Sequence, residues 1–538
     1  MERKLYCNGT VLTMEREMYA QAVLTEGGKI LAVGDVRELG QMGGRKAQVV
    51  DLQGKALLPA FVDAHSHFTA CASRQMEADL TGADSFEEIR RRLGEFVSQR
   101  RIPEGQWVRG AGYDQNRLRE GRHPDRLLLD AAVGDRPAVI SHQSGHMGVF
   151  STAALKRLGI HKEAQAPQGG VMGRKEDGSL SGYMEEAAFL KCQSMVPMAS
   201  PQDFLEAYRQ AQQMYFSYGI TTAQEGMMNR AMGDFYRLLL QSGLLKLDVA
   251  AYVGVGEGEA LFEAFHEYKG GYRDHFRLGG WKMFLDGSPQ GRTAWLREPY
   301  VPAGNSGEEP GYKGYPVLED AEVYGYLRRA QEGGRQILTH CNGDGACAQY
   351  LRVYARVLED LGLSSAGAIR PVMVHAQLLG LDQLGEVKRL GVMPSFFAAH
   401  VYHWGEVHVK NLGLERASRI SPAASALRAG IPFTFHQDAP VLRPDMLKTV
   451  WCAVNRRTKE GRVLGPQERI PVLEALKAVT VNGARQYFEE KEKGTIGPGK
   501  QADFVILDRD PLKAAQEELR QIRVEATVKA GETVYGEV

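Results

Sequence analysis

Short apolar segments that end in polar or ionisable residues recur through the middle of this chain and alternate with helical stretches. Eight strand candidates can be counted: 57–65, 219–225, 247–255, 280–286, 336–340, 371–375, 391–396 and 431–438. A (β/α)8 barrel requires eight parallel strands with intervening helices, and its chemistry lies at the C-terminal strand ends. The pattern therefore predicts an α/β protein whose main body is a TIM-type barrel.

The two ends of the chain have a different pattern, in which short strands are divided by turn signals. Asn8-Gly9 and Gly27-Gly28 separate strand-like runs, and Gly497-Pro498-Gly499 precedes more of them. We expect residues 1–55 and 491–538 to form one small β-sandwich domain and residues 56–490 to form the barrel. Residues from about 70 to 205, with a further strand candidate at 138–141, are expected to be a large insertion after barrel strand one that covers the barrel mouth.

Composition limits the classes of partner. Lys plus Arg and Asp plus Glu number 66 each, so the formal net charge is zero, which argues against nucleic acid or an anionic membrane. No apolar signal core follows the N-terminus and no stretch approaches the length of a membrane span. The six cysteines include no CxxC pair, which favours a reducing cytoplasm. We expect a cytoplasmic enzyme with a small-molecule substrate. The sequence leaves open whether the protein forms a homodimer.

Two histidines, His65 and His67, end the first strand candidate. Side chains two residues apart on a strand point the same way, so both imidazoles can approach one metal ion. His340, His375 and Asp438 end three other strand candidates. Each residue alone is a weak signal, but four histidines and an aspartate at the same end of barrel strands predict a metal centre.

Lys282 interrupts the apolar strand candidate 280–286. Burial of an ammonium group is costly and lowers its pKa. A neutral buried amine can add carbon dioxide to give a carbamate, whose two oxygens are able to bridge metal ions. The alternative is a lysine whose amine extends along the strand to water, and the sequence leaves both readings open.

This set of residues resembles the amidohydrolase superfamily: an HxH on strand one, a lysine on strand four, histidines on strands five and six and an aspartate on strand eight. A narrower resemblance is to the amidohydrolase family 3 branch, which includes N-substituted formamide deformylases. Its motifs here are Trp107–Asp114, Ser144-Gly145-His146, Asp286-Gly287-Ser288 with Arg292-Thr293-Ala294, His340 with Gly343-Asp344, and His375-Ala376-Gln377. Leu57–His67 and Gly497–Phe504 resemble the entry motif of the superfamily and its return to the small domain. Three positions depart from the branch: Gly345 replaces the usual Arg, Val374 the usual Glu and Gln437 the common Ser.

The resemblance implies one or two divalent ions, with zinc as the expected metal. The implied ligands are His65, His67, Lys282, His340, His375 and Asp438. It further implies that Lys282 is N6-carboxylated if two ions bind, that a metal-activated water is the nucleophile, and that Asp438 acts as general base and then acid. The expected reaction is hydrolysis of a non-peptide C–N bond of the amide or N-formyl type.

Substrate contacts are expected from polar and aromatic residues near the strand ends and in the insertion. The candidates are His146, Arg292, His400 and His403 for a polar or anionic part, and Tyr113, Trp295, Phe397 and Trp404 for an apolar wall. The same metal site could instead serve a deaminase, a cyclic amidase or an esterase. A non-catalytic regulatory protein is a third reading, against which the six retained ligand positions argue.

Overall fold

A computed structural model describes residues 2–44, 47–143, 146–168, 170–197, 200–302 and 311–537. The chain divides into two compact units, Met1–Ala70 with Ala211–Val538, and Cys71–Gln210. Ser144 and Gly145 of the motif in the insertion lie outside the described residues. Each unit is considered below by itself.

Eight strands of the larger unit form one sheet in sequential order, and each neighbouring pair is parallel. They are β8 (Phe61–Val62), β15 (Ile220–Met228), β16 (Asp248–Gly254), β17 (Phe276–Phe284), β18 (Gln336–Cys341), β19 (Val372–His375), β20 (Met393–Phe396) and β21 (Thr434–Phe435). The sheet curls until its ends meet, because Ser66 and Ala439 form a parallel bridge and the His67 N–H donates to the Ala439 carbonyl at 2.8 Å. The predicted TIM-type barrel is confirmed.

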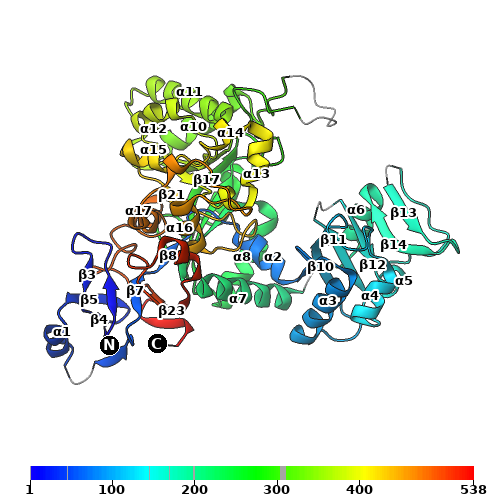
Figure 1. The fold of residues 1–538 in the computed structure, drawn as a ribbon, viewed down its shortest axis with the longest axis horizontal. Coiled ribbons are helices and arrows are strands. Elements are labelled where there is room, and N and C mark those ends of the chain that lie inside the picture. Colours follow the sequence, from blue (N-terminus) through cyan, green and yellow to red (C-terminus); the bar gives the residue numbers. More distant parts are fainter. Residues whose placement is uncertain are drawn as a thin grey trace. The chain divides into compact units, whose positions relative to one another are not determined.

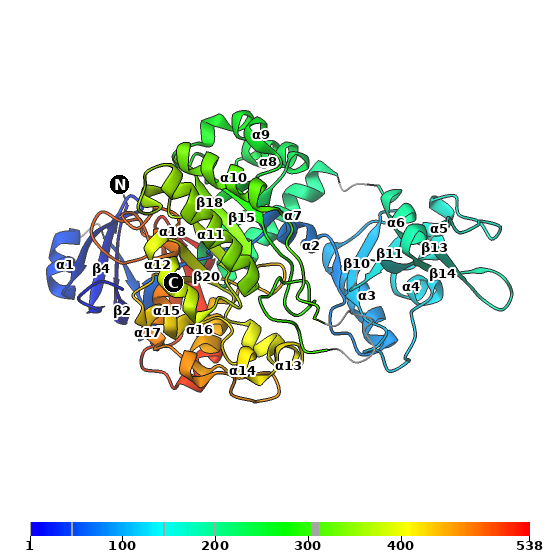
Figure 2. The same ribbon diagram turned by 90° about the horizontal axis from the view of Figure 1, so that it is seen from above.

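Helices cover the outside of this sheet (Figure 2). They are α7 (Pro201–Ser217), α8 (Arg230–Ser242), α9 (Gly258–Ala264), α10 (Asp320–Glu332), α11 (Asp344–Asp360), α12 (Leu384–Leu390), α13 (His400–Leu412), α14 (Leu414–Ala417), α15 (Ala423–Arg428), α16 (Met446–Asn455), α17 (Val472–Ala478) and α18 (Val481–Gln486). Every residue of β16 and β18 is buried, as expected for parallel strands that are covered on both faces.

The two ends of the chain lie side by side in a small β sandwich (Figure 1). One sheet holds β2 (Thr10–Leu12), β3 (Tyr19–Ala20), β7 (Ala56–Pro59), β22 (Phe504–Leu507), β23 (Val524–Lys529) and β24 (Glu532–Gly536). The other holds β1 (Arg3–Cys7), β4 (Ala22–Glu26), β5 (Lys29–Gly34) and β6 (Gln48–Asp51), beside which lies α1 (Val36–Gly43). The predicted sandwich from both ends of the chain is therefore present.

The first strand candidate, 57–65, is not one strand. Its first part is β7 of the sandwich, and only Phe61–Val62 belongs to the barrel. The hydrogen-bond partner changes between consecutive residues: Ala60 N–H donates to Asp503 O at 3.0 Å, whereas Phe61 N–H donates to Gly219 O at 2.8 Å. An apolar run buried in two adjoining sheets cannot be divided by its composition, which explains the error.

The unit Cys71–Gln210 has its own six-stranded sheet and core. Its strands are β9 (Ala78–Asp79), β10 (Val108–Tyr113), β11 (Ala138–His142), β12 (Met147–Phe150), β13 (Gly170–Arg174) and β14 (Leu180–Glu185), and its helices are α3 (Phe86–Arg100), α4 (Arg126–Val133), α5 (Thr152–Arg157) and α6 (Glu186–Ser194). The helix α2 (Phe68–Gln75) and the first residues of α7 connect it to the larger unit. The strand candidate at 138–141 is β11, while coverage of the barrel mouth stays a prediction.

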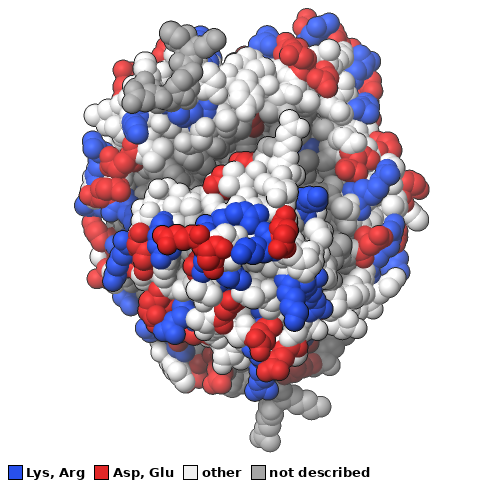
Figure 3. Space-filling model, turned by 90° about the vertical axis from the view of Figure 1, so that its right-hand side faces the viewer, with Lys and Arg blue, Asp and Glu red and all other residues white. Residues whose placement is uncertain are grey.

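The surface carries both signs of charge. On the face drawn in Figure 3, acidic and basic side chains are interspersed, in keeping with the 66 residues of each sign in the sequence. A polyanion therefore meets no continuous basic field on that face. Among the helices that the structure describes, none has the length and apolar character to cross a membrane.

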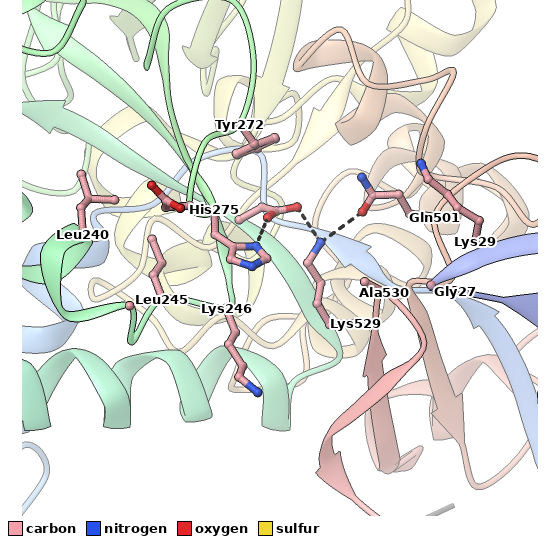
Figure 4. A pocket seen from close by; sticks show the side chains of 14 residues that line it. Gly27, Lys29, Leu240, Leu245, Lys246, Tyr272, His275, Gln501, Lys529 and Ala530 are labelled. Atoms are coloured by element: carbon pink, nitrogen blue, oxygen red, sulfur yellow. Dashed lines mark hydrogen bonds and ion pairs between the residues drawn. The ribbon is translucent and has the colours of Figure 1, made fainter. Parts of the chain in front are cut away.

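A buried ion network lies where the sandwich meets the barrel, beside a cavity of about 660 Å³ (Figure 4). Asp248, at the start of β16, accepts from the Lys493 amine, from Lys529 Nζ at 2.5 Å and from His275 Nδ1 at 2.7 Å. Lys529 also contacts Asp503 at 2.8 Å. Burial alone would raise the Asp248 pKa, but the two ammonium groups outweigh it and hold that pKa well below its usual range.

We expect Asp248→Asn to lower the free energy of unfolding by roughly 3–5 kcal/mol, because two buried ammonium groups would lose their shared carboxylate. The Asp248 pKa is depressed in the folded chain, so this stabilisation is present at neutral pH and is lost as the pH falls below about 4. Thermal unfolding from pH 7 to pH 3 measures both effects. Glu532→Gln is the control, because that carboxylate faces Lys246 at 3.6 Å on the exposed surface. Equal melting temperatures for the two variants would contradict the assignment.

Candidate metal centre

The barrel brings its strand ends together at one edge. His65 and His67 lie in the segment after β8, His375 closes β19 and Asp438 follows β21. Lys282 lies within β17 and His340 within β18. Because each neighbouring pair of strands is parallel and the ring closes at Ser66 and Ala439, residues from the first and last strands become neighbours.

Asp438 lies among three imidazoles. Its Oδ1 is 3.4 Å from His65 Nε2 and 3.5 Å from His67 Nε2, and its Oδ2 is 3.9 Å from His375 Nε2. A tetrahedral zinc ion with bonds of about 2.0–2.2 Å separates its ligand atoms by about 3.4 Å. The spacing of His65, His67 and Asp438, whose ligand atoms lie within 4.8 Å of one another, therefore suits one divalent ion.

The tautomer of His65 is fixed by Gln224. The Gln224 Nε2 donates to the Ala64 carbonyl and to Tyr487 Oη, both at 2.9 Å, so its Oε1 is the atom that faces His65 Nδ1 at 2.6 Å. His65 Nδ1 must carry the proton of that hydrogen bond. Its Nε2 therefore presents a lone pair toward Asp438.

A buried carboxylate, that of Glu225, lies near His67. Glu225 Oε2 accepts from the Thr69 N–H at 2.8 Å and from Tyr236 Oη at 2.9 Å, which leaves Oε1 facing His67 Nδ1 at 4.0 Å. Sequence reasoning did not select Gln224 or Glu225. The available signal was their place at the end of strand candidate 219–225, where polar residues follow an apolar run.

The site also fits a cation electrostatically. Burial holds the pKa values of His65 and His375 well below the usual value for histidine, so both rings are neutral and able to act as ligands. Asp438 Oδ1 is buried and has no hydrogen-bond partner among the described residues. A cation between this oxygen and the His65 Nε2 lone pair, 3.4 Å apart, would be attracted to both. The donor set and its geometry thus suit a divalent metal.

Lys282 is fully buried, which excludes the reading in which its amine extends to water. Its Nζ lies 3.4 Å from His65 Nε2 and 5.0 Å from the centre of the Phe284 ring. Burial lowers the pKa of Lys282 to about 7, against a smaller opposite effect of Asp438. A substantial fraction of this amine is therefore neutral near neutral pH.

His340 contacts the cluster through its ring, whose centroid is 4.6 Å from that of His375. Its Nδ1 is 3.2 Å from Asp286 Oδ1, and its Nε2 accepts from Asn342 Nδ2 at 3.3 Å. Asp286 also accepts from the backbone N–H groups of Asn342 at 2.9 Å, Gly343 at 2.7 Å and Trp295 at 3.1 Å. One carboxylate thus organises the loop after β18, and His340 lies outside the compact group of His65, His67 and Asp438.

The backbone is strained where the ligands leave their strands. His375, Ala376 and Asp438 have φ values of 68°, 45° and 53°, in the left-handed region that non-glycine residues rarely adopt. Gly226 is needed for a different reason. A Cβ there would lie 2.8 Å from His65 Cε1 and 3.0 Å from His67 Cε1, so only glycine lets β15 approach the two rings.

The sequence model of the amidohydrolase family matches residues 48–535, which is most of the chain. This chain belongs to the amidohydrolase family. It is 28% identical to the N-substituted formamide deformylase of Arthrobacter pascens, over 99% of this chain and 98% of that protein. It is 25% identical to the Arabidopsis thaliana protein LONG AFTER FAR-RED 3, over 99% of this chain and 91% of that one.

Solved structures agree with this assignment. An uncharacterized metal-dependent hydrolase from Pyrococcus furiosus aligns with a TM-score of 0.74 and 26% identity, over 95% of this chain and all of that one. The family and this neighbour together make the chain a hydrolase that depends on a divalent metal.

The three departures from the amidohydrolase pattern have local explanations. A Cβ at Gly345 would lie 2.8 Å from the Trp295 carbonyl oxygen, so the loop that carries Trp295 occupies the space of the usual Arg. Val374 packs in the apolar cluster of the barrel interior. Gln437 donates to the Asp445 carbonyl at 3.0 Å and to Thr449 Oγ1 at 2.6 Å. None of the three removes a candidate ligand.

The expected substrate residues of the larger unit differ in how they are held. Arg292 lies over the Tyr300 ring at 4.9 Å and donates to the Val301 carbonyl at 3.1 Å, which gives it a structural role. His400 is buried and its Nδ1 is 3.0 Å from His408 Nε2. Burial lowers the pKa of His403 to about 4. Substrate contact by Arg292, Trp295, His400 and His403 stays a prediction.

Two further expected substrate residues belong to the insertion. Tyr113 is fully buried in the core of that unit, and its Oη is 3.1 Å from His123 Nδ1. The His146 side chain is 60% exposed and its Nδ1 lies 3.1 Å from Glu186 Oε2. Their contact with substrate also stays a prediction.

We expect Gly226→Ala to disrupt the metal centre, because the added methyl group overlaps both rings of the HxH pair. Overpacking of this kind costs about 1–3 kcal/mol, and displacement of the rings should lower bound metal in proportion. Metal content and thermal unfolding measure the two effects. The control is Gly325→Ala in α10, where the new methyl group meets no atom within 4 Å and should be neutral or stabilising. Full metal content in the Gly226→Ala variant would contradict the close approach.

Proposed function

We propose that this amidohydrolase cleaves a non-peptide C–N bond of the amide or N-formyl type, with zinc as its metal. The observation that carries the proposal is the set of imidazole Nε2 atoms of His65, His67 and His375 at 3.4–3.9 Å from the Asp438 carboxylate. The relative named N-substituted formamide deformylase, 28% identical over nearly the whole chain, supports the bond type. A divalent cation bound at these residues would polarise the scissile carbonyl and lower the pKa of a coordinated water.

In this proposal Asp438 is the proton carrier. Its carboxylate stands between His65, His67 and His375, where it can take a proton from the attacking water and deliver it to the leaving nitrogen. In the overall reaction the water oxygen bonds to the carbonyl carbon, the C–N bond breaks, and both water protons are retained by the products. An N-substituted formamide would give formate and the free amine.

Lys282 supplies the second part of the proposal. Its amine is fully buried, lies 3.4 Å from His65 Nε2, and has a pKa near 7. A neutral amine can react with carbon dioxide at neutral pH to form an N6-carboxylate. That group would place two anionic oxygens beside His65, where they could hold a second ion.

Metal content and turnover test the proposed function directly. The purified protein should contain at least one divalent ion per chain, and a chelator should abolish hydrolysis that Zn²⁺ then restores. The assay panel contains N-benzylformamide, N-acyl amino acids and a cyclic amide, with formate, amine or carboxylate release as the readout. A protein that neither contains nor takes up a divalent metal would contradict the proposal. If the protein turned over only the cyclic amide, the proposed bond type would be wrong, but the proposed metal centre would stand.

We expect Asp438→Asn to lower kcat by about 10²–10⁴ fold, because an amide cannot take up the water proton. The variant should keep most of its metal, since His65, His67 and His375 are unchanged. Asp51→Asn, at an exposed position of the small sandwich, is the control and should retain full activity. Unchanged turnover in the Asp438→Asn variant would refute the role of this carboxylate.

A further inference from the structure

A fifth imidazole, His436, contacts the candidate metal centre from outside the predicted ligand set. His375 Nδ1 lies 3.0 Å from His436 Nε2, and His436 Nδ1 lies 2.9 Å from Ser395 Oγ. His436 and Ser395 are fully buried, and His375 is 4% exposed. The three residues come from the ends of β19 and β20 and from the segment after β21, so they form a hydrogen-bonded chain across three neighbouring strands.

The direction in which these hydrogen bonds run decides which nitrogen of His375 presents a lone pair. His375 Nδ1 and His436 Nε2 face each other at 3.0 Å, so one of them must donate a hydrogen and the other accept it, and a neutral imidazole has one N–H group. In one arrangement His375 Nδ1–H donates to His436 Nε2, and His436 Nδ1–H donates to Ser395 Oγ. In the opposite arrangement Ser395 donates first, and the N–H of His375 moves to Nε2.

The geometry favours the first arrangement. There, both ring N–H groups of the chain have an acceptor at hydrogen-bond distance. In the opposite arrangement the His375 Nε2–H would point toward Asp438 Oδ2 at 3.9 Å, which is too far for a hydrogen bond. A ring N–H has a fixed direction, so a buried one left without an acceptor costs about 1–3 kcal/mol. The hydrogen left over in the first arrangement is that of the Ser395 hydroxyl, which can rotate.

We propose that Ser395 and His436 fix His375 as its Nδ1–H tautomer and that His436 is thereby a positioning residue of the metal centre. The fixed tautomer keeps the His375 Nε2 lone pair aimed at the space beside Asp438. His436 does for His375 what Gln224 does for His65, although an imidazole takes the place of an amide. The inference rests on the proposed use of His375 Nε2 as a metal ligand.

Three substitutions separate this role from simple packing. His436→Leu removes the acceptor for His375 Nδ1–H. His436→Gln restores it, because the amide oxygen can accept from His375 while the amide nitrogen donates to Ser395. His408→Leu is the matched control, since His408 is also a fully buried imidazole paired with another at 3.0 Å, but its partner is His400.

The first readout is the His375 tautomer in metal-free protein, obtained from long-range ¹H–¹⁵N correlation spectra of ¹⁵N-histidine-labelled samples. The second is Zn²⁺ affinity, measured by competition with a chelator. We expect His436→Leu to shift the His375 signal away from the Nδ1–H pattern and to weaken Zn²⁺ binding about 10- to 100-fold. His436→Gln and His408→Leu should keep both properties within a few fold of the wild type.

Two results would overturn the inference: a wild-type His375 in the Nε2–H form, or a folded His436→Leu variant with unchanged tautomer and Zn²⁺ affinity. If His436→Leu fails to fold, His436→Gln and Ser395→Ala decide the matter. Ser395→Ala leaves His436 Nδ1–H without its acceptor and should destabilise the Nδ1–H form of His375. An unchanged spectrum would contradict the hydrogen-bonded chain from Ser395 through His436 to His375. A wild-type protein that binds no Zn²⁺ would overturn the proposed function instead. The spectra of the metal-free protein would still show which tautomer His375 adopts.

Discussion

The parallel ladder of the barrel is the constraint on which the rest of the site depends. Parallel pairing in sequential order puts every strand end at one edge, and closure at Ser66 and Ala439 makes the first strand a neighbour of the last. His65 and Asp438, which are far apart in sequence, therefore come within 3.4 Å. The strained φ values of His375 and Asp438 turn their side chains at the point where the ladder ends.

Each candidate histidine ligand has a partner that faces the ring nitrogen turned away from the centre or bonds to it. Gln224 fixes His65, Glu225 faces His67, Asp286 bonds His340, and His436 bonds His375. Gln224 and Glu225 lie on β15, which pairs with β8, and Asp286 follows β17, which pairs with the strand of His340. The same ladder therefore positions the candidate ligands and the groups that face them. This coupling explains why a metal centre can be built on very short strands such as β8 and β21.

The sequence predicted the features that repeat. Eight apolar segments with polar ends were sufficient for the barrel, and the ordinal positions of His65, Lys282 and Asp438 were sufficient for the family, because both depend on strand order alone. It did not predict the break at Ala60, where hydrogen bonds pass from Asp503 to Gly219 without any change in composition. Nor did it select Gln224 and Glu225, because an orienting residue is recognised only by the ring nitrogen that it faces.

The carboxylates at the two ends of the barrel have opposite surroundings. At the N-terminal end, Asp248 is surrounded by Lys493, Lys529 and His275, and this compensation stabilises the contact between the barrel and the sandwich. At the C-terminal end, Asp438 Oδ1 lies 3.4 Å from His65 Nε2 and 3.5 Å from His67 Nε2 and has no close hydrogen-bond donor among the described residues. The same donors at Asp438 would stabilise the fold but would fill the space that a cation needs. The space left beside this carboxylate is the space that a cation would need, and a metal that bound there would stabilise the folded chain.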